Sequence, residues 1–429
     1  MKTPSIKQCP THGSISRLVI VLLFSAVMSA CASTYPRPQL QKEAVELEEP
    51  RFEIPEPLLF DVRIKVFDPG KLPKSMNASR GLSEKIRKTE SAYVAVELKK
   101  TLESAGRWGA VRVVPAEHAG DELLVTGCIL KSNGEELKLE VTAVDARGRA
   151  WFEKKSFRSA VSEEDCTEAV DKQCEVFQSL YNQIANELAA AAQELTIEET
   201  LEVRKIAEMR FAEELVPSAF SDYLVEEKRG SFGNRSNLLT VDRLPSEEDE
   251  FMGRVQRIRV RDDMLIDALD AHYESLHREV KPVYLDWRKT RVIEMNLIRK
   301  VDDKKNAQVA GGFAAVVGGA LLGAAAADSG GYNPQAGAAV GALVGAGASL
   351  MVQASRVSEE SEINKVQLEE LGISFGAEVE PITLEVEGET VQLTGTAESQ
   401  YAQWRELLAV LYKVETEGDL VPLAQPLAE

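Results

Sequence analysis

The sequence predicts an α+β protein with an α/β sandwich domain, a long helical region, a two-helix hairpin and a small C-terminal module of the order αββα. Three observations predict this. Strand patterns and amphipathic helical stripes follow one another over residues 58–196. A heptad-like pattern runs through much of residues 246–308. Two arms rich in Gly and Ala then fill residues 309–353, where Asp328 is the only charged side chain.

The first 30 residues have the composition of a secretory signal peptide. Lys2, Lys7 and Arg17 precede the apolar run 18–28, and small residues follow it. This run of eleven residues is too short for an ordinary membrane-spanning helix. A basic start, a short apolar stretch and a small-residue cleavage site are typical of an export signal, so we expect residues 1–30 to be removed.

The end of this segment, Met28-Ser-Ala-Cys31, resembles a bacterial lipobox. The resemblance implies cleavage before Cys31 and lipidation of its thiol and its new amino group. Met28 departs from the pattern, in which Leu is commoner, and ordinary cleavage nearby is the alternative. In the same family, Ala32 in place of Asp implies the outer membrane, with the protein facing the periplasm.

Residues 31–57 are expected to be the lipid anchor and a tether. Prolines spread among acidic residues leave no helical or strand period. Such a segment holds a folded domain away from a lipid surface. The prolines are Pro36, Pro38, Pro50, Pro55 and Pro57.

The mature chain is strongly acidic. Loss of residues 1–30 removes three of the 50 basic residues and none of the 69 acidic ones, which leaves 47 basic residues and a formal charge of −22. A negative field of this size repels nucleic acid and anionic lipid head groups. We therefore expect no nucleic-acid partner.

Three cysteines besides Cys31 remain in the mature chain, and an exported protein lies where disulfides form. Cys166 and Cys174 are the candidate pair. Eight helical residues would separate their Cα atoms by about 12 Å, beyond the reach of a disulfide, so the bridge requires a bend between them. Free buried thiols are the alternative. Neither a CxxC pair nor a His cluster accompanies them or Cys128, so we expect no metal and no cofactor.

The folded domain is expected to span residues 58–196. Phe60, Val62, Ile64 and Val66 alternate with polar residues, as in a half-buried strand. An amphipathic helix over 83–104 is expected to end with Gly106 as its C-cap. Strand patterns follow at 110–114, 123–130, 137–144 and 151–157, with turn signals at Asn133-Gly134 and Arg147-Gly148, and a helix over 168–195 closes the domain.

The stretch VAVELKKTLESAGRWGAVRVVP, followed by DELLVTGCIL, resembles the opening of a periplasmic α/β lipoprotein domain. The same plan occurs in the curli-secretion lipoprotein, the peptidoglycan-synthase activator lipoproteins and the transporter auxiliary lipoproteins. The resemblance covers about a quarter of the chain and rests on the order of the elements. It implies a domain that binds other proteins and has no catalytic site.

Residues 197–245 are expected to form a connector, helical to about residue 225 and then a polar loop centred on RGSFGNRSN. The next segment, 246–308, is expected to be a long helix with a heptad seam, in which Asp262 is off-type and Pro282 introduces a kink. A helix packed on its own domain and a coil that binds a partner both fit this pattern. The seam residues are Phe251, Val255, Ile258, Leu265, Leu269, Leu276, Val280, Val283 and Trp287.

The arms of residues 309–353 carry small residues at every fourth position. This spacing keeps them on one helical face, where the missing side chains let two backbones approach closely. In water so many glycines would weaken a helix, since each costs ~1 kcal/mol relative to Ala. The predicted helix-packing residues are Gly311, Ala315, Gly319 and Gly323 in the first arm and Gly337, Gly341, Gly345 and Ser349 in the second.

The turn sequence Asp328-Ser-Gly-Gly-Tyr-Asn-Pro is expected to join the two arms into a hairpin. Each arm of about 17 residues would span roughly 25 Å as a helix, close to the thickness of a thin outer membrane. The pattern resembles the glycine-zipper hairpin of several bacterial outer-membrane lipoproteins, which implies insertion into the membrane or packing at it, and oligomerisation. A hairpin buried in a helical assembly and a low-complexity linker are the alternatives.

The C-terminal module is expected to span residues 354–415, with a loose tail at 416–429. Helix patterns at 358–371 and 400–412 flank strand patterns at 381–386 and 391–393, which meet at Glu387-Gly388. The run VEGETVQLTGTAESQYAQWRELL is similar to the second half of a BON domain, an envelope module associated with membrane surfaces. The resemblance covers about 50 residues.

The sequence carries no His-Glu-x-x-His motif, no GxSxG elbow and no Walker loop. His272 and His277 are five residues apart on a helix and would point in different directions, which does not suit a metal pair. We therefore expect a non-enzymatic lipoprotein that supports envelope integrity or an envelope or secretion assembly. Its expected partners are membrane lipid and either a second copy or another envelope protein. A regulatory binding module for a periplasmic enzyme or transporter is the alternative, and an enzyme acting on peptidoglycan or lipid is the second.

Overall fold

The structure is a computed structural model that describes most of the chain between residues 37 and 417. The chain divides into two units, of which one holds Pro38–Val292 and Ser361–Glu429 and the other holds Met1–Arg37 and Ile293–Glu360. The first of these is called the α/β unit below. The described residues are 37–40, 44–74, 79, 81–229, 236–246, 249–325, 356–357, 359–371, 381–386 and 389–417, with the backbone alone for 229, 236, 305–325, 384–386, 389 and 413–417.

The α/β unit is built on a five-stranded mixed sheet with the order β2-β1-β3-β4-β5. The central strand β1 runs parallel to both of its neighbours, and β3, β4 and β5 form an antiparallel meander. Gly134 and Gly148 have φ of 95° and 84° at the two meander turns, which explains both turn signals of the sequence. The strands are β1 (Val62–Lys65), β2 (Val111–Val114), β3 (Leu123–Ser132), β4 (Glu136–Asp145) and β5 (Ala150–Ala160).

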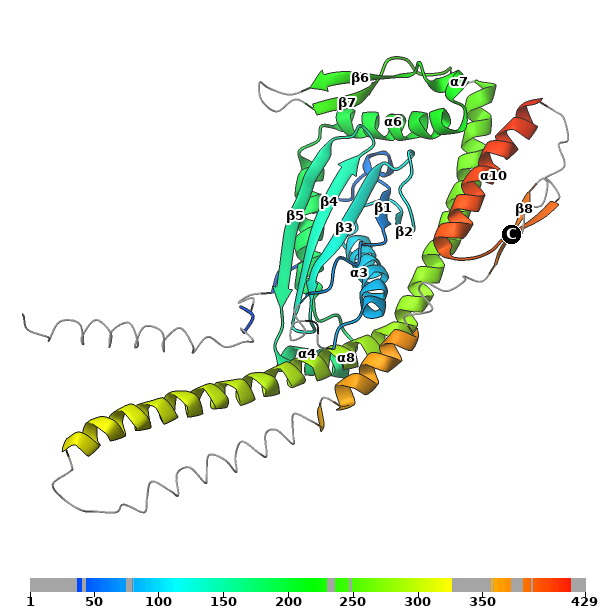
Figure 1. The fold of residues 1–429 in the computed structure, drawn as a ribbon. Coiled ribbons are helices and arrows are strands. Elements are labelled where there is room, and N and C mark those ends of the chain that lie inside the picture. The colour runs from blue at the N-terminus through cyan, green and yellow to red at the C-terminus, as the bar shows by residue number, and fades with distance from the viewer. Residues whose placement is uncertain are drawn as a thin grey trace, which may run out of the picture. The chain divides into compact units, whose positions relative to one another are not determined.

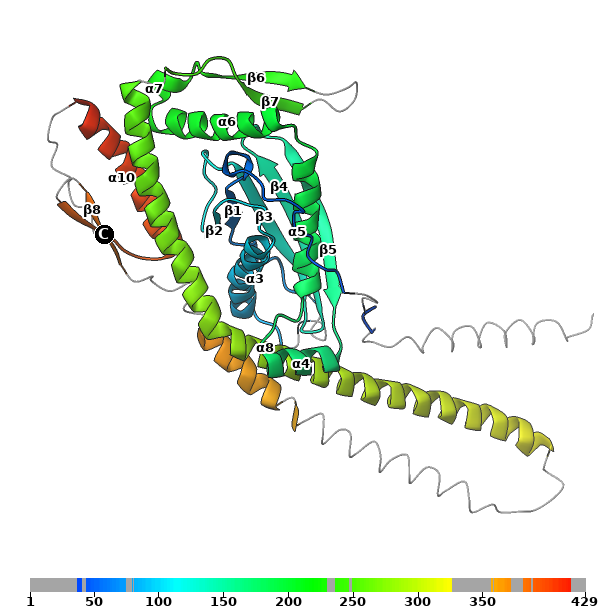
Figure 2. The same ribbon diagram turned by 180° about the vertical axis from the view of Figure 1, so that it is seen from behind.

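Two helices, α3 (Glu84–Ser104) and α5 (Gln178–Gln193), cover one face of this sheet (Figure 2). The Ser83 hydroxyl caps the start of α3 by accepting a hydrogen bond from the Ile86 amide at 3.2 Å. The alternate strand residues that face these helices, such as Val62, Val125 and Val141, are fully buried. The opposite face carries half-exposed polar side chains and faces the viewer in Figure 1. The predicted strands and the α3 helix are thus confirmed.

The helix predicted over 168–195 is two helices, α4 (Glu163–Lys172) and α5. Gln173 ends α4 in a left-handed conformation with φ of 52°. The Glu175 carboxylate then accepts a hydrogen bond from the Phe177 amide at 3.0 Å, and both of these side chains are buried. The linker between the two helices contributes buried residues of its own. The apolar pattern of the sequence therefore ran on through the break and predicted a single helix.

The predicted connector is wrong in its second half. Helices α6 (Ile197–Leu215) and α7 (Pro217–Phe220) are followed by a hairpin of β6 (Leu224–Arg229) and β7 (Ser236–Val241) where we expected a helix end and a polar loop. Leu224, Leu238 and Thr240 are buried, so the hairpin is amphipathic. The Leu239 amide donates to the Arg147 carbonyl at 2.9 Å, which attaches the hairpin to the turn between β4 and β5. The charged outer residues of β6 hid this alternation.

Helix α8 (Glu250–Ala325) contains the predicted seam and most of the first glycine arm. Seven of the nine seam residues are buried, Val283 is half-buried, and Phe251 is 46% exposed. Since seven of the nine side chains pack in or against the cores of the α/β unit, the seam belongs to a helix packed on its own domain. Figures 1 and 2 show this part of α8 running past the β2 edge of the sheet.

A polar stripe accompanies the apolar seam on α8. Asp263, Asp270, His277 and Tyr284 recur every seven residues, and each hydrogen-bonds to the α/β unit. Their partners are Arg63 on β1 and Lys99, Glu97 and Glu90 on α3, in that order. A seven-residue repeat keeps side chains on one face of a long helix. This polar stripe therefore sets the register of α8 against α3.

The C-terminal segment adds three further elements to the α/β unit. A helix over 359–371 buries Leu368 against Val280 and Tyr284 of α8. The hairpin of β8 (Ile382–Val386) and β9 (Glu389–Leu393) and the helix α10 (Ala397–Glu417) confirm the predicted strand pair and final helix. Figure 1 shows α10 alongside α8.

The predicted glycine-zipper hairpin lies largely outside the described residues. The backbone of its first arm is helical as far as Ala325, and Gly311, Ala315, Gly319 and Gly323 lie in this part of α8. Residues 326–353, with the turn and the second arm, are not described. Within the part of the chain that is described, no helix combines the length and apolar character required to cross a membrane.

The edge strand β2 is closed by α8. The Val113 amide donates to Asp270 Oδ1 at 2.8 Å, and Asp270 Oδ2 accepts a hydrogen bond from the Lys99 ammonium group. Lys99 also pairs with Glu274 at 2.5 Å. A buried strand edge needs partners for its amides, and here a carboxylate supplies one. Asp270 is 8% exposed, so its interactions are largely shielded from water.

We expect Asp270→Ala to lower the free energy of unfolding by about 2–4 kcal/mol, because it leaves the Val113 amide unpaired and removes one partner of the buried Lys99. Urea unfolding of the mature chain measures this loss. Asp267→Ala, on the same helix, is the matched control. Asp267 also forms an ion pair, with Arg112, but its side chain is 58% exposed, so we expect a change of less than ~1 kcal/mol. Equal effects of the two substitutions would contradict the role given to Asp270.

Candidate functional site

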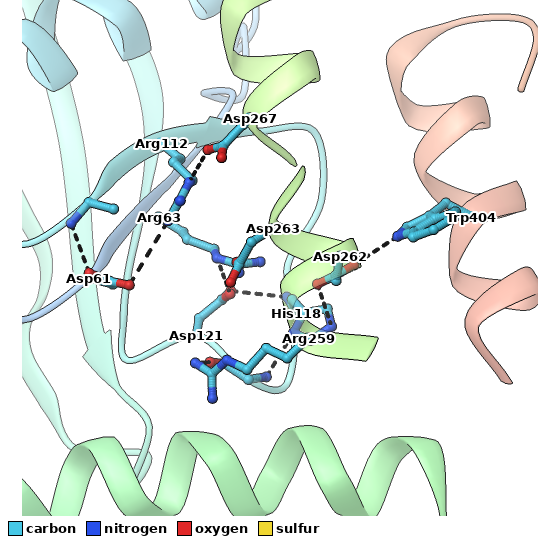
Figure 3. A network of polar contacts seen from close by, with 12 residues as sticks. Asp61, Arg63, Arg112, His118, Asp121, Arg259, Asp262, Asp263, Asp267 and Trp404 are labelled. Atoms are coloured by element: carbon cyan, nitrogen blue, oxygen red, sulfur yellow. Dashed lines mark hydrogen bonds and ion pairs between the residues drawn. The ribbon is translucent and has the colours of Figure 1, made fainter. Parts of the chain in front are cut away.

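A cluster of charged side chains joins five segments of the α/β unit near one end of α8. We call it the junction cluster, and Figure 3 shows most of it. Strand β1, the loop before β3, and helices α6, α8 and α10 each contribute at least one residue. The members are Arg63, His118, Asp121, Glu214, Asp262, Asp263, Trp404 and Arg405.

Arg63 lies at the centre of this cluster. Its Nε atom is 3.1 Å from Asp121 Oδ1, and its Nη2 donates to Asp263 Oδ1 at 3.0 Å. The guanidinium group is almost fully buried although β1 presents it on the polar face of the sheet. Burial raises the pKa of Asp121 to about 6, although the Arg63 charge opposes this effect.

His118 is held in a defined orientation. The Gly120 amide donates to Nδ1 at 2.8 Å, so the proton of the neutral ring is carried by Nε2. Nε2 lies 3.8 Å from Glu214 Oε2 and 3.9 Å from Asp262 Oδ2. Burial lowers the pKa of His118 well below its usual value, and Arg405 is the first of several arginines that lower it further. The imidazole therefore remains neutral at pH 7.

Asp262 is the residue that the heptad pattern marked as off-type, and the structure gives the reason. It is fully buried, and its Oδ1 accepts a hydrogen bond from the indole nitrogen of Trp404 at 3.1 Å. Arg405, the next residue on α10, lies 3.6 Å from the same oxygen and 2.5 Å from Glu214 on α6. Asp262 therefore attaches the C-terminal helix to α8. A charged residue in an apolar seam was the sequence signal for this contact.

The junction cluster borders a hollow on the open face of the sheet. This hollow has a volume of about 520 Å³. A second hollow, of about 540 Å³, lies beside it along the sheet, and Thr126 lines both. The first is lined by side chains that include Glu117, His118, Asp121, Arg210 and Glu214, and the second by side chains that include Lys65, Cys128, Glu140, Thr142 and Lys154.

The rim of the second hollow contains an unusual backbone conformation. Lys154 has φ of 48°, in the left-handed region that non-glycine residues rarely adopt. It lies where the register of β5 against β4 shifts, and its amide donates to the Thr142 hydroxyl at 2.9 Å. Bulges of this kind redirect a side chain and are frequent beside functional sites. The irregularity brings the Lys154 side chain to the hollow.

The charged side chains of the junction cluster pair mainly with one another. Nδ1 of His118 already accepts a hydrogen bond from a backbone amide, and Asp121 is paired with Arg63. Within the described residues, no group of three or more His, Cys, Asp or Glu side chains is arranged to hold a metal ion. We regard the two hollows of the open face as the candidate binding surface and the cluster as their support.

A second buried cluster lies where α8 meets α3 and the linker between α4 and α5. Glu90 Oε1 accepts hydrogen bonds from Ser132, Tyr284 and Arg288 at 2.5, 3.0 and 3.2 Å. The Arg288 guanidinium also lies 4.4 Å from the ring of Phe177, a cation–π contact. This cluster fixes the part of α8 that precedes the glycine arm in the sequence.

Glu175 of the same linker is buried near this cluster. Its Oε2 accepts a hydrogen bond from the Tyr93 hydroxyl at 2.7 Å. Burial, with the nearby Glu97 charge, raises the pKa of Glu175 to about 7, although Arg288 opposes the shift. Glu97 accepts a hydrogen bond from His277 at 2.5 Å. His277 therefore helps to attach α8 to α3.

The residues singled out from the sequence are not gathered at one place. Cys31 and the second-arm positions Gly337, Gly341, Gly345 and Ser349 lie outside the described residues. The candidate disulfide between Cys166 and Cys174 is not formed, and both thiols are free. The required bend is present at Gln173, but Cys166 is buried in the core and Cys174 is exposed. Burial also raises the pKa of the Cys166 thiol to about 12, which keeps it protonated.

Comparison of the chain with protein-family models, with curated proteins and with solved structures finds no match in any of the three.

We expect Glu175→Gln to remove a pH-dependent loss of stability. Because the pKa of Glu175 is about 7 in the folded chain and near 4.5 when exposed, the folded state keeps a proton that the unfolded chain has released. The contribution of Glu175 to stability therefore falls as the pH rises from about 4.5 to 7. The neutral Gln should be more stable than wild type at pH 8, by up to ~3 kcal/mol, and similar to it at pH 4.

Urea unfolding of both proteins at intervals between pH 4 and pH 8 measures this difference. Glu164→Gln changes an exposed carboxylate on α4 and should keep the wild-type pH dependence. If the stability of the Glu175→Gln protein declines with pH as steeply as that of wild type, the buried carboxylate is not the group responsible.

Proposed function

We propose that this chain is a non-enzymatic outer-membrane lipoprotein, anchored through Cys31, whose glycine-zipper hairpin inserts in or packs at the membrane and oligomerises. In this role it supports envelope integrity or an envelope or secretion assembly on the periplasmic side. The signal peptide, the lipobox-like Cys31 and the two striped arms of the sequence support the location.

The observation that carries the proposal is the continuity of α8. A single helix of 76 residues contains the polar stripe that packs on the α/β unit and the first four positions of the glycine stripe. The heptad seam is already used within the α/β unit, so the glycine stripe is the interface that remains for another arm or another copy. In this proposal, the chain is a binding unit joined by one helix to a membrane hairpin.

We expect the Cys31→Ser protein to remain with membranes after cell fractionation, because the hairpin is a second attachment. Adding Gly319→Leu and Gly341→Leu should lower the oligomer size in detergent, since branched side chains on the stripe keep the backbones apart. Size-exclusion chromatography with light scattering measures this change.

The matched control adds Val316→Leu and Val340→Leu, which enlarge side chains off the stripe, and should leave the oligomer size unchanged. A Cys31→Ser protein found wholly in the aqueous fraction would refute the membrane hairpin. An unchanged oligomer size in the glycine variant would refute its packing role.

The second candidate function is a regulatory binding module for a periplasmic envelope enzyme or transporter. The two adjoining hollows on the open face, and the bulge that brings Lys154 to one of them, favour this function. The face presents acidic and basic groups together with exposed apolar surface at Leu130, which is 42% exposed. Such a mixture suits a protein partner better than a small ligand.

We expect a photo-crosslinking residue at Thr142, in the second hollow, to capture an envelope protein in cells. Thr126→Arg should abolish that crosslink. Thr126 lines both hollows, so a long charged side chain at this position would fill part of each. Urea unfolding should show that the variant remains folded, since Thr126 is only half-buried. A probe at Gln193, on the helical side, is the control and should not capture the same protein. A crosslink that survives Thr126→Arg would count against this face.

A further inference from the structure

A short stretch of the predicted tether is bound along α5. Residues 44–48, called the strap below, form four hydrogen bonds with side chains of this helix. The Val45 amide donates to the Ser179 hydroxyl at 3.2 Å, and the Val45 carbonyl accepts from Asn182 Nδ2 at 2.7 Å. Asn186 Nδ2 donates to the Glu46 carbonyl, and Asn186 Oδ1 accepts from the Glu48 amide, both at 2.9 Å.

The spacing of these side chains matches an extended backbone. Ser179, Asn182 and Asn186 lie three and four residues apart, so they share one face of α5. Asn186 contacts the carbonyl of one strap residue and the amide of the residue two further on. A partner residue in a β-ladder makes the same pair of contacts. The side-chain amide of Asn186 therefore acts as a substitute for a neighbouring strand.

The site is supported from within the domain. Gln178 donates to Asn182 Oδ1 at 2.9 Å and to the Thr101 hydroxyl of α3 at 3.0 Å, which directs the Asn182 amide nitrogen at the strap. In the strap, Val45 and Leu47 are half-buried and alternate with exposed residues, and Leu47 packs against the main core. The alternation confirms that the strap lies as an extended segment on the helix.

We propose that α5 carries a binding site for extended polypeptide, that the strap occupies it reversibly, and that this contact sets how far the α/β unit reaches from its lipid anchor. The reach rests on the proposed anchoring at Cys31, whereas the occupancy of the site does not. Because the hydrogen bonds of Ser179, Asn182 and Asn186 to the strap all go to backbone atoms, the site recognises conformation more than sequence. The occupant is this chain's own tether.

The effect on reach follows from chain length. With the strap bound, about 14 residues separate Cys31 from Val45, which span at most ~45–50 Å. The next point of attachment is Glu56, whose carbonyl accepts from Arg204 at 3.1 Å. With the strap released, about 25 residues separate Cys31 from Glu56 and span at most ~80–90 Å. Release of the strap therefore nearly doubles the greatest distance that the tether can span between Cys31 and the α/β unit.

The contacts indicate that the strap opens before the domain unfolds. Its four hydrogen bonds join neutral groups at the surface, and the strap residues include exposed Ala44, Glu46 and Glu48. Short surface segments of this kind open locally, without disturbing the core. The strands of the sheet contribute to the buried core, so we expect their amides to exchange only when much of the unit unfolds.

Hydrogen exchange on the full mature chain tests the site directly and needs no membrane. In wild type we expect protection of the Val45 and Glu48 amides that is weaker than the protection of β3 and β4. Asn186→Ala should speed exchange at Glu48 by about five- to tenfold, the effect of losing one neutral hydrogen bond, and leave β3 and β4 unchanged. Gln193→Ala, which removes an exposed amide at the end of the same helix, should have no effect. The proposal would be overturned if the strap amides of wild type were unprotected. It would also be overturned if Asn186→Ala left the exchange rate of the Glu48 amide unchanged.

Neutron reflectometry on supported bilayers tests the reach. Lipidated Asn182→Ala/Asn186→Ala protein should place its protein layer farther from the bilayer than wild type, by more than ~10 Å, and Gln193→Ala should not. An unchanged layer position in the double variant would overturn the control of reach by the strap. A wild-type protein that fails to attach to the bilayer would instead count against the proposed lipid anchor, and the exchange experiment would still decide the occupancy of the site.

Discussion

The hydrogen bond from the Val113 amide to Asp270 is the contact on which the arrangement of the α/β unit depends. It closes the edge of the sheet at β2 with a helix, and an open edge strand would otherwise present its amides to water or to another chain. Once Asp270 is fixed there, the seven-residue repeat places Asp263 at Arg63 and His277 at Glu97. The Val113 amide and the polar stripe thus agree on one register for the docked part of α8.

The buried charges along α8 account for specificity better than for stability. Removing two charges from water costs several kcal/mol, which their attraction offsets only when the geometry is good. Here the carboxylates of Asp270 and Glu90 and the guanidinium of Arg288 have several partners each, so a shift of α8 by one turn would leave them unpaired. An apolar seam alone would tolerate such a shift more easily. The polar stripe therefore makes one register of α8 preferred, and α10 is tied to that register through Asp262.

This arrangement separates the tasks within the chain. One face of the sheet is covered by α3 and α5, one edge is closed by α8, and the open face carries two hollows. The helical face also has a binding role, because α5 holds the strap. In the proposed function, the distance from the membrane is then set on the helical side of the unit, and partners are bound on the opposite side.

Much of the fold followed from the sequence because the period of apolar residues reports burial directly. Val62 and Ile64 on β1 and the stripe of α3 were identified in this way, as was the helix that carries Asp262. The glycine stripe and the lipobox-like Cys31 are also features of the sequence alone. The tertiary structure decided what periodicity does not contain, namely which surface each stripe meets. It showed that the seam of α8 packs on its own unit, that Cys166 and Cys174 lie in different environments, and that Asn182 and Asn186 hold the strap. The contacts of Asp262 with Trp404 and of Asn186 with Glu46 each join residues more than a hundred positions apart in the sequence. No local pattern of residues records such a pairing.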